Sequence, residues 1–142
     1  LKPRLGEVLL LDARAGARYR GEIEPIDPVA GHIPTAVHAP TDDNLGPDGR
    51  FRNAEELATR FAALRAGARE AGMPAAADPA APVVTSCGSG VSACHNALAM
   101  RIAGLPDPIL YPGSYSDWSR AGEPISVGPE PGPPPAVTGP TM

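Results

Sequence analysis

The residue best suited to do chemistry in this chain is Cys87, which directly follows an apolar segment at residues 82–86 (PVVTS). Small residues and two glycines follow the cysteine, and a helix is predicted after them. Ligands of parallel sheets bind just beyond the carboxyl ends of the strands. A loop at a helix N-terminus presents free N–H groups and the positive end of the helix dipole, which stabilise a thiolate. The pattern predicts a nucleophilic cysteine, and a buried core cysteine is the alternative.

The loop after Cys87 is expected to surround its sulfur with hydrogen-bond donors. The two glycines let the backbone curl until several N–H groups point inward, and the two serine hydroxyls add further donors. Such a ring stabilises the cysteine anion or a charged adduct formed on it. The expected binding loop consists of Gly88, Ser89, Gly90, Val91 and Ser92.

The elements that must position this loop alternate between strands and helices. This alternation predicts an α/β domain with a mostly parallel central sheet flanked by helices. We expect strands at residues 7–12, 36–39, 82–86 and 109–111, and helices at 53–64, 91–103 and 114–120.

Several details of these elements can be checked against a structure. Asn53 is expected to cap its helix, with Glu56 completing a capping box. The helix after the cysteine loop is expected to bury Val91, Leu98 and Ile102 on one apolar stripe. Residues 66–82, rich in Ala, Gly and Pro, are predicted to be a loop with at most one helical turn. Trp118 is expected to anchor the core.

The composition fits one domain of a globular protein. The chain has 142 residues, of which 42% are apolar, and a net charge of −4, which argues against binding to nucleic acid. No apolar run approaches the roughly 20 residues of a membrane span, and two cysteines exclude a disulfide scaffold. No signal-type segment follows the first residue, and we expect a cytoplasmic location. We expect the folded domain at residues 6–126, followed by a disordered tail at 127–142 that holds six of the nineteen prolines.

Five segments, in order along the chain, resemble the rhodanese family of sulfurtransferases, in particular the C-terminal catalytic domain of its mercaptopyruvate and thiosulfate sulfurtransferases. The segment from Cys87 is similar to the active-site loop of the mercaptopyruvate branch, which usually has Thr where this chain has Ser92. The resemblance implies a rhodanese-like three-layer domain. The matching segments are LLDARAGARYRG (10–21), AGHIPTAVHAP (30–40), LGPDGRFRNAEEL (45–57), CGSGVSAC (87–94) and ILYPGSYSDWS (109–119).

The resemblance implies a sulfurtransferase mechanism. The Cys87 thiolate attacks the outer sulfur of a donor, either 3-mercaptopyruvate or thiosulfate, and becomes a persulfide that a thiol or cyanide then consumes. No metal or cofactor is required. Thiosulfate-type members usually carry cationic side chains just after the cysteine, where this chain has neutral Gly88 and Ser89. This favours 3-mercaptopyruvate and leaves thiosulfate open.

The resemblance also suggests how the donor carboxylate is held. Arg18 matches a family position that binds this carboxylate, but Ile26 stands where a second arginine is usual. Arg20 lies nearby and is the candidate to compensate. A solvated surface role is the alternative for both arginines.

Four other residues are assigned structural roles. Asp12 is expected to accept hydrogen bonds from the loop backbone or from Arg14, and His32 to lie near the site as a structural hydrogen-bonding residue. Thr35 replaces the glycine that is usual in the family, which predicts a slightly different turn. Cys94 is expected to be a core cysteine rather than a resolving thiol.

Other functions remain possible at this point. A non-catalytic rhodanese-like module that carries sulfur or docks partners is the main alternative. A tyrosine-phosphatase-type loop needs a cysteine, five further residues and then an arginine. Ala93 occupies the arginine position here, which disfavours an arsenate- or phosphate-processing enzyme. The resemblance further implies a second rhodanese-like domain N-terminal to this one, and no nucleic-acid or membrane partner is expected.

Overall fold

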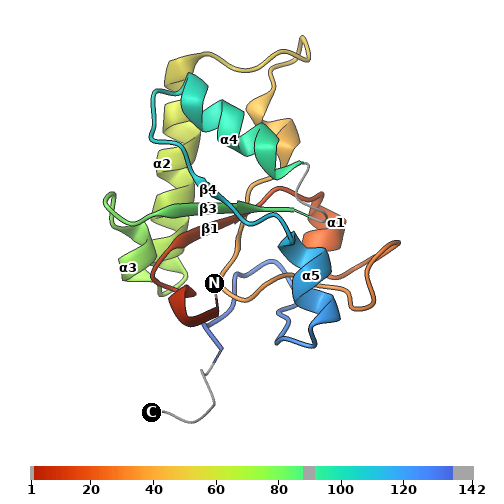
Figure 1. Ribbon diagram of the computed structural model, residues 1–142. Coiled ribbons are helices and arrows are strands. Elements are labelled where there is room, and N and C mark those ends of the chain that lie inside the picture. The colour runs from red at the N-terminus through yellow and green to blue at the C-terminus, as the bar shows by residue number, and fades with distance from the viewer. Residues whose placement is uncertain (1, 88–91, 136–142) are drawn as a thin grey trace.

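The computed structural model of the chain describes residues 2–87 and 92–135. Its four strands form one parallel sheet in the order β2-β1-β3-β4 (Figure 1). The prediction of a mostly parallel α/β domain is confirmed. The strands are β1 (Leu9–Asp12), β2 (Val37–His38), β3 (Val83–Ser86) and β4 (Ile109–Leu110).

Helices cover both faces of this sheet and make a three-layer domain (Figure 1). One face packs on α2 (Ala54–Glu70), α3 (Pro74–Ala77) and α4 (Ala93–Ile102). The other face packs on α1 (Gly16–Tyr19) and α5 (Ser114–Arg120). Two short 3₁₀ helices, η1 (Lys2–Arg4) and η2 (Thr41–Asn44), precede β1 and follow β2.

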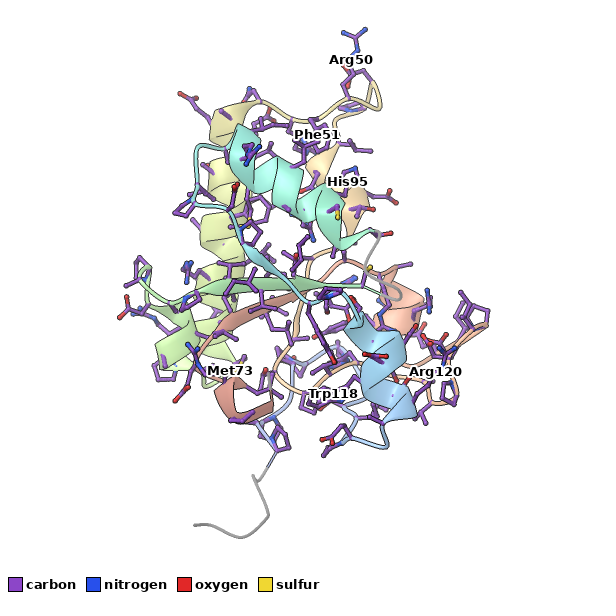
Figure 2. The ribbon with its side chains drawn as sticks, viewed as in Figure 1. Arg50, Phe51, Met73, His95, Trp118 and Arg120 are labelled. Atoms are coloured by element: carbon purple, nitrogen blue, oxygen red, sulfur yellow. The ribbon has the colours of Figure 1, made fainter. Side chains whose placement is uncertain are left out.

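Strand β1 is buried on both faces, as its continuous apolar run predicts. Leu9 and Leu11 point to the cluster under α2 and α4. Leu10 points the other way, to the cluster that contains Tyr19 and Trp118. Trp118 is 4% exposed and donates from its indole N–H to the Pro124 carbonyl at 2.7 Å, so its predicted anchoring role is confirmed (Figure 2).

Helix α2 has the predicted capping box but is longer than predicted. The Asn53 side chain accepts from the Glu56 N–H at 2.9 Å, and the Glu56 carboxylate accepts from the Asn53 N–H at 3.4 Å. The helix runs on to Glu70, and α3 follows after three residues, so the loop predicted at residues 66–82 was wrong in its first half. Alanine and arginine favour helix strongly enough to outweigh the single Gly67.

Helix α4 faces the core with a different side from the one predicted. Leu98 and Ile102 are 48% and 37% exposed. The buried positions are Ala93, Asn96, Ala99 and Met100. Small side chains let the helix approach the sheet closely, and Asn96 is satisfied there by the Ala39 carbonyl at 2.9 Å.

The chain beyond α5 stays attached to the body as far as Pro131. His32 and Ser126 exchange two backbone hydrogen bonds of 2.8 and 2.9 Å, and the Pro131 carbonyl accepts from the Thr35 N–H at 2.9 Å. Gly31 has a φ of 132°, and a side chain there would collide with the Ser126 carbonyl. Of the predicted tail, residues 127–131 are therefore attached to the folded domain. Residues 136–142 lie outside the described residues.

Thr35 itself has a φ of +78°, in the left-handed region that favours glycine. Threonine is therefore accommodated at this turn only because surrounding contacts hold it. No helix within the described ranges is both long enough and apolar enough to cross a membrane.

We expect Asn53→Ala to lower the free energy of unfolding by about 1 kcal/mol, because it leaves an N-terminal N–H of α2 without its acceptor. Urea denaturation followed by circular dichroism measures this change. Glu55→Ala, an exposed first-turn substitution that leaves the cap intact, is the control. Equal midpoints for the two variants would contradict the capping role.

Candidate active site

Cys87 is the first residue after β3, at the carboxyl end of the sheet. It is buried, with 2% of its surface exposed, and packs against Ala13 and Ala93. Ala13 follows β1, and Ala93 begins α4, so the ends of two strands and the start of a helix meet at the cysteine. This is the location that the sequence predicts for the nucleophile.

The expected ring of donors is only partly covered by the structure. Gly88, Ser89, Gly90 and Val91 lie outside the described residues, so their N–H groups stay a prediction. Ser92 is exposed and directly precedes α4. Its side chain makes no capping hydrogen bond to that helix.

The backbone of Cys87 is held by α5. Its N–H donates to the Ser114 hydroxyl oxygen at 3.0 Å, and its carbonyl accepts from the Tyr115 N–H at 2.9 Å. The Ser114 hydroxyl in turn donates to the Tyr111 carbonyl at 2.8 Å. Ser114 is fully buried and has a φ of +52°, a left-handed conformation that is costly for a residue with a side chain. Nothing in the sequence alone singles out Ser114, because its role depends on a contact across 27 residues.

A buried ion pair lies at the end of β1. Asp12 is fully buried and accepts from both the backbone N–H and the guanidinium of Arg14, the latter at 2.8 Å. Arg14 also donates to the Gly31 carbonyl at 2.7 Å and lies 4.0 Å above the Tyr115 ring. Burial alone would lower the pKa of Arg14, but the hydrogen bond and charge of Asp12 outweigh burial and raise it. The Arg14 guanidinium therefore stays charged, and its contacts with Asp12 fix the backbone on either side of Ala13.

Arg18 is engaged inside the protein. Its Nη2 lies 3.0 Å from a Glu24 carboxylate oxygen and 3.2 Å from one of Asp27, and both carboxylates are almost completely buried. Burial raises the pKa of Glu24, but hydrogen bonds from two backbone N–H groups and from Arg18 lower it overall. The cluster therefore stabilises the fold at neutral pH, and that stability is lost as the pH falls through the depressed pKa. Ile26, where the family has its second arginine, is 67% exposed.

Arg20 is placed differently, with its charge open to solvent. Its side chain is 39% exposed and pairs with the exposed Glu22 at 2.6 Å. The guanidinium lies over Gly16, where a Cβ atom would come within 2.6 Å of its Nη1. Gly16 begins α1 and lies close in the chain to Ala13, which packs against Cys87. The Arg20 guanidinium is therefore at the same end of the sheet as Cys87.

Two of the three histidines, His32 and His38, have structural surroundings. His32 is fully buried, stacks on Tyr19 with ring centroids 3.9 Å apart, and lies within hydrogen-bonding distance of the Tyr19 and Pro131 carbonyls. The Nε2 atom of His38 lies 2.9 Å from the Arg14 carbonyl oxygen. Among residues 2–87 and 92–135, no group of three His, Cys, Asp or Glu side chains could hold a metal ion.

Cys94 is exposed, so the prediction of a core cysteine was wrong. Cys94 directly follows Ala93, and Ala93 lies on the buried face of α4. One residue turns an α-helix by about 100°, which carries the Cys94 side chain out of the core.

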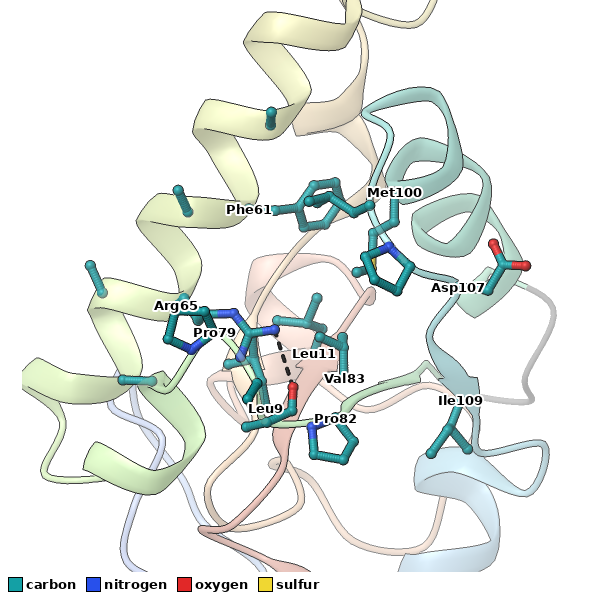
Figure 3. Close-up of a pocket in the computed structure, with 18 of the residues that line it drawn as sticks. Leu9, Leu11, Phe61, Arg65, Pro79, Pro82, Val83, Met100, Asp107 and Ile109 are labelled. Carbon is teal, nitrogen blue, oxygen red and sulfur yellow. Dashed lines mark hydrogen bonds between the residues drawn. The ribbon is translucent and has the colours of Figure 1, made fainter.

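A separate cavity of about 870 Å³ lies between α2, α4 and the sheet (Figure 3). Its walls are mainly apolar, and the Arg65 guanidinium crosses one side, donating to the Asp78 and Ala81 carbonyls at 2.7 and 3.2 Å. Cys87 and its neighbours Ala13 and Ala93 do not line it. The cavity is therefore not part of the candidate active site.

Known proteins are similar to this chain in both sequence and fold. A family model described as "Rhodanese-like domain" matches residues 1–121. The chain is 52% identical over 120 residues to a probable 3-mercaptopyruvate sulfurtransferase of Pseudomonas aeruginosa, and 36% identical over 118 residues to a thiosulfate sulfurtransferase of Mus musculus. These alignments cover 83% and 81% of this chain but only 39% and 36% of the relatives, so the chain spans less than half of their length. The crystal structure of the Tum1 protein from Saccharomyces cerevisiae superposes with a TM-score of 0.69 at 28% identity, over 90% of this chain and 42% of that one.

We expect Ser114→Ala to lower the free energy of unfolding by about 1–3 kcal/mol, because the buried Cys87 N–H loses its acceptor. Ser114→Gly loses the same acceptor but relieves the left-handed backbone, which offsets roughly 1 kcal/mol. Chemical denaturation of both variants measures the difference. A glycine variant no more stable than the alanine variant would argue against backbone strain at this position.

Proposed function

Because the chain belongs to the rhodanese-like domain family, we propose that it transfers sulfane sulfur from a small donor to a thiol or cyanide acceptor through a persulfide on Cys87. The position of Cys87 carries this proposal. It is the first residue after a central strand, its backbone is fixed by α5, and it touches the first residue of α4. The names of the relatives from Pseudomonas aeruginosa and Mus musculus support the same reaction class.

In the proposed reaction, the Cys87 thiolate attacks the outer sulfur of the donor and forms an S–S bond. With 3-mercaptopyruvate, the carbon–sulfur bond breaks, its electron pair moves to the carbon as an enolate, and a proton completes pyruvate. An acceptor thiolate then attacks the outer sulfur of the persulfide and releases the Cys87 thiolate. With cyanide as acceptor the product is thiocyanate. The expected donors of Gly88–Ser92 would stabilise the charged sulfur in both steps.

We propose 3-mercaptopyruvate as the preferred donor. The two residues after the cysteine, Gly88 and Ser89, are neutral and suit a less charged donor than the thiosulfate dianion. The relative that is 52% identical is named for this donor. Thiosulfate is the second candidate, since the relative from Mus musculus is named for it.

Of the two arginines expected to hold the donor carboxylate, the contacts favour Arg20. The Arg18 guanidinium already faces two buried carboxylates, and a donor carboxylate would have to displace one of them. Arg20 has one exposed partner, and an exposed ion pair is worth little. We therefore assign carboxylate binding to Arg20 and a positioning role to Arg18.

We further propose that a second rhodanese-like domain, N-terminal to this one, packs on the loop between α1 and β2. Three large apolar residues of that loop, Ile23, Ile26 and Val29, are 44–67% exposed, and Val127 beside Gly21 and Gly31 is 69% exposed. Clustered exposed apolar side chains indicate a contact surface. The relatives are long enough to contain such a domain. The expected cytoplasmic location stays a prediction.

Exposure to 3-mercaptopyruvate is expected to add the mass of one sulfur atom to the peptide that contains Cys87, as measured by mass spectrometry of the intact and digested protein. Cys87→Ser is expected to abolish both this adduct and thiocyanate formation. Cys94→Ser, at the exposed cysteine seven residues later, is the matched control and keeps both. A folded wild-type chain that never carries the adduct would support a non-catalytic module instead.

Arg20→Gln is expected to raise KM for 3-mercaptopyruvate about tenfold with little change in kcat. The variant loses a charge-assisted contact to the donor carboxylate that is equally strong in the enzyme–substrate complex and in the transition state. Steady-state kinetics with cyanide as acceptor measure the two constants. Arg4→Gln removes a similar exposed pair with Glu7, far from Cys87 in the chain, and serves as control. An unchanged KM would return the carboxylate role to Arg18.

A further inference from the structure

A buried polar network holds the first turn of α4, the helix that follows the Cys87 loop. At its centre is Asn44, the last residue of η2, which is fully buried. Its Nδ2 donates to the Asn96 Oδ1 at 2.8 Å and lies 3.0 Å from the His95 Nδ1. Its Oδ1 accepts from the Arg60 Nη1 at 2.7 Å. Arg60 is anchored in turn by the Pro40 carbonyl at 2.9 Å.

The chemistry of these partners fixes which atom faces which. A guanidinium only donates, so the Asn44 atom that faces Arg60 is the oxygen, and its amide nitrogen faces α4. A carbonyl only accepts, so the Asn96 amide nitrogen faces Ala39 and its oxygen faces Asn44. The two hydrogens of the Asn44 amide therefore point to Asn96 and to His95.

His95 must consequently be neutral in this arrangement. Its Nδ1 faces a donor and therefore accepts, which places the single ring proton on Nε2. The Phe51 ring lies beside the imidazole, with centroids 4.8 Å apart (Figure 2). A proton on Nδ1 would set two N–H groups against each other and break the contact.

Arg60 is the charged member of the Asn44 network, and the charges of Asp43 and Arg52 act on it. Arg60 stands behind Asn44, and burial lowers the pKa of Arg60. Arg52 follows in the next segment and is paired with Glu56 at 3.5 Å. Asp43 is the nearby carboxylate, and its charge acts on Arg60 in the opposite sense to Arg52.

We propose that Asn44, backed by Arg60, is a positioning residue for Cys87 and that it acts only while His95 is neutral. This inference rests on the proposed sulfur transfer at Cys87. Ala93, which packs on Cys87, lies two residues before His95 in the same helical turn. Protonation of His95 releases that turn from η2, moves Ala93 away from the cysteine, and slows persulfide formation.

The decisive variant is His95→Asn, because the Asn oxygen can accept from Asn44 and does not titrate. Rates of Cys87 persulfide formation are measured by rapid-quench mass spectrometry from about pH 8 to about pH 5.5, the range in which histidines titrate. The ratio of the His95→Asn rate to the wild-type rate is expected to rise about fivefold as the pH falls, the loss of roughly one hydrogen bond. A ratio that stays constant with pH overturns the proposal.

Two further measurements keep the test independent of catalysis. ¹⁵N NMR of the imidazole is expected to show His95 at neutral pH with its proton on Nε2, and a proton on Nδ1 overturns the proposal. Hydrogen exchange of the first turn of α4 at low pH is expected to be faster in wild type than in His95→Asn. Arg101→Gln, which removes an exposed pair with Asp107 at the far end of α4, is the control and leaves both profiles unchanged.

Failure of the proposed function is distinguishable from failure of this inference. If the wild-type chain forms no persulfide at any pH, sulfur transfer is wrong. In that case, alkylation of Cys87 by iodoacetamide is measured on the peptide that contains Cys87. The ratio of the His95→Asn rate to the wild-type rate is expected to show the same change with pH. Asn44→Ala is expected to lower the persulfide rate at about pH 8, and this effect is expected to disappear as the pH falls and His95 takes up a proton. Unchanged hydrogen exchange at about pH 8 in a folded Asn44→Ala protein also overturns the proposal.

Discussion

The surroundings of Cys87 depend on one buried ion pair, formed by Asp12 and Arg14. Both side chains are 1–2% exposed, and a buried charge without its partner destabilises a protein by about 3–5 kcal/mol. Once Asp12 stands at the end of β1, Arg14 must therefore turn back to it. The same guanidinium reaches the Gly31 carbonyl and the Tyr115 ring, so it joins β1, the loop before β2, and α5. Ala13 lies between these two charged residues in the chain and packs against Cys87.

The arginines near this end of the sheet divide into buried and accessible cations. Arg14 and Arg18 are neutralised by carboxylates inside the protein, and they hold the loop between α1 and β2 in shape. Arg20 keeps an exposed face and a weak partner. A binding site for a small anion needs both kinds, because the buried pairs supply a rigid frame and only an accessible charge can exchange its partner for a ligand.

The cysteine loop is bounded by two different kinds of attachment. Before it, the Cys87 backbone is hydrogen-bonded to Ser114 and Tyr115 of α5. After it, α4 is held by amide side chains that reach back to Ala39 and Asn44. The first attachment consists of backbone and hydroxyl groups that do not titrate, whereas the second includes a histidine. Of the two attachments, only the one after the loop therefore contains an ionisable side chain.

The sequence by itself determined the features that depend on neighbouring residues. The apolar run of β1, the capping box at Asn53, the cysteine at the end of β3 and the order of strands and helices all follow from local pattern. The rotation of α4 does not, because Asn96 binds Ala39 across 57 residues, and this contact turns Leu98, Ile102 and Cys94 to solvent. The partners of Arg18 and the hold of Ser114 on Cys87 were likewise decided only by tertiary structure. Periodicity describes which side chains share a face, but the choice of the buried face rests on long-range hydrogen bonds and charge pairing that no local window contains.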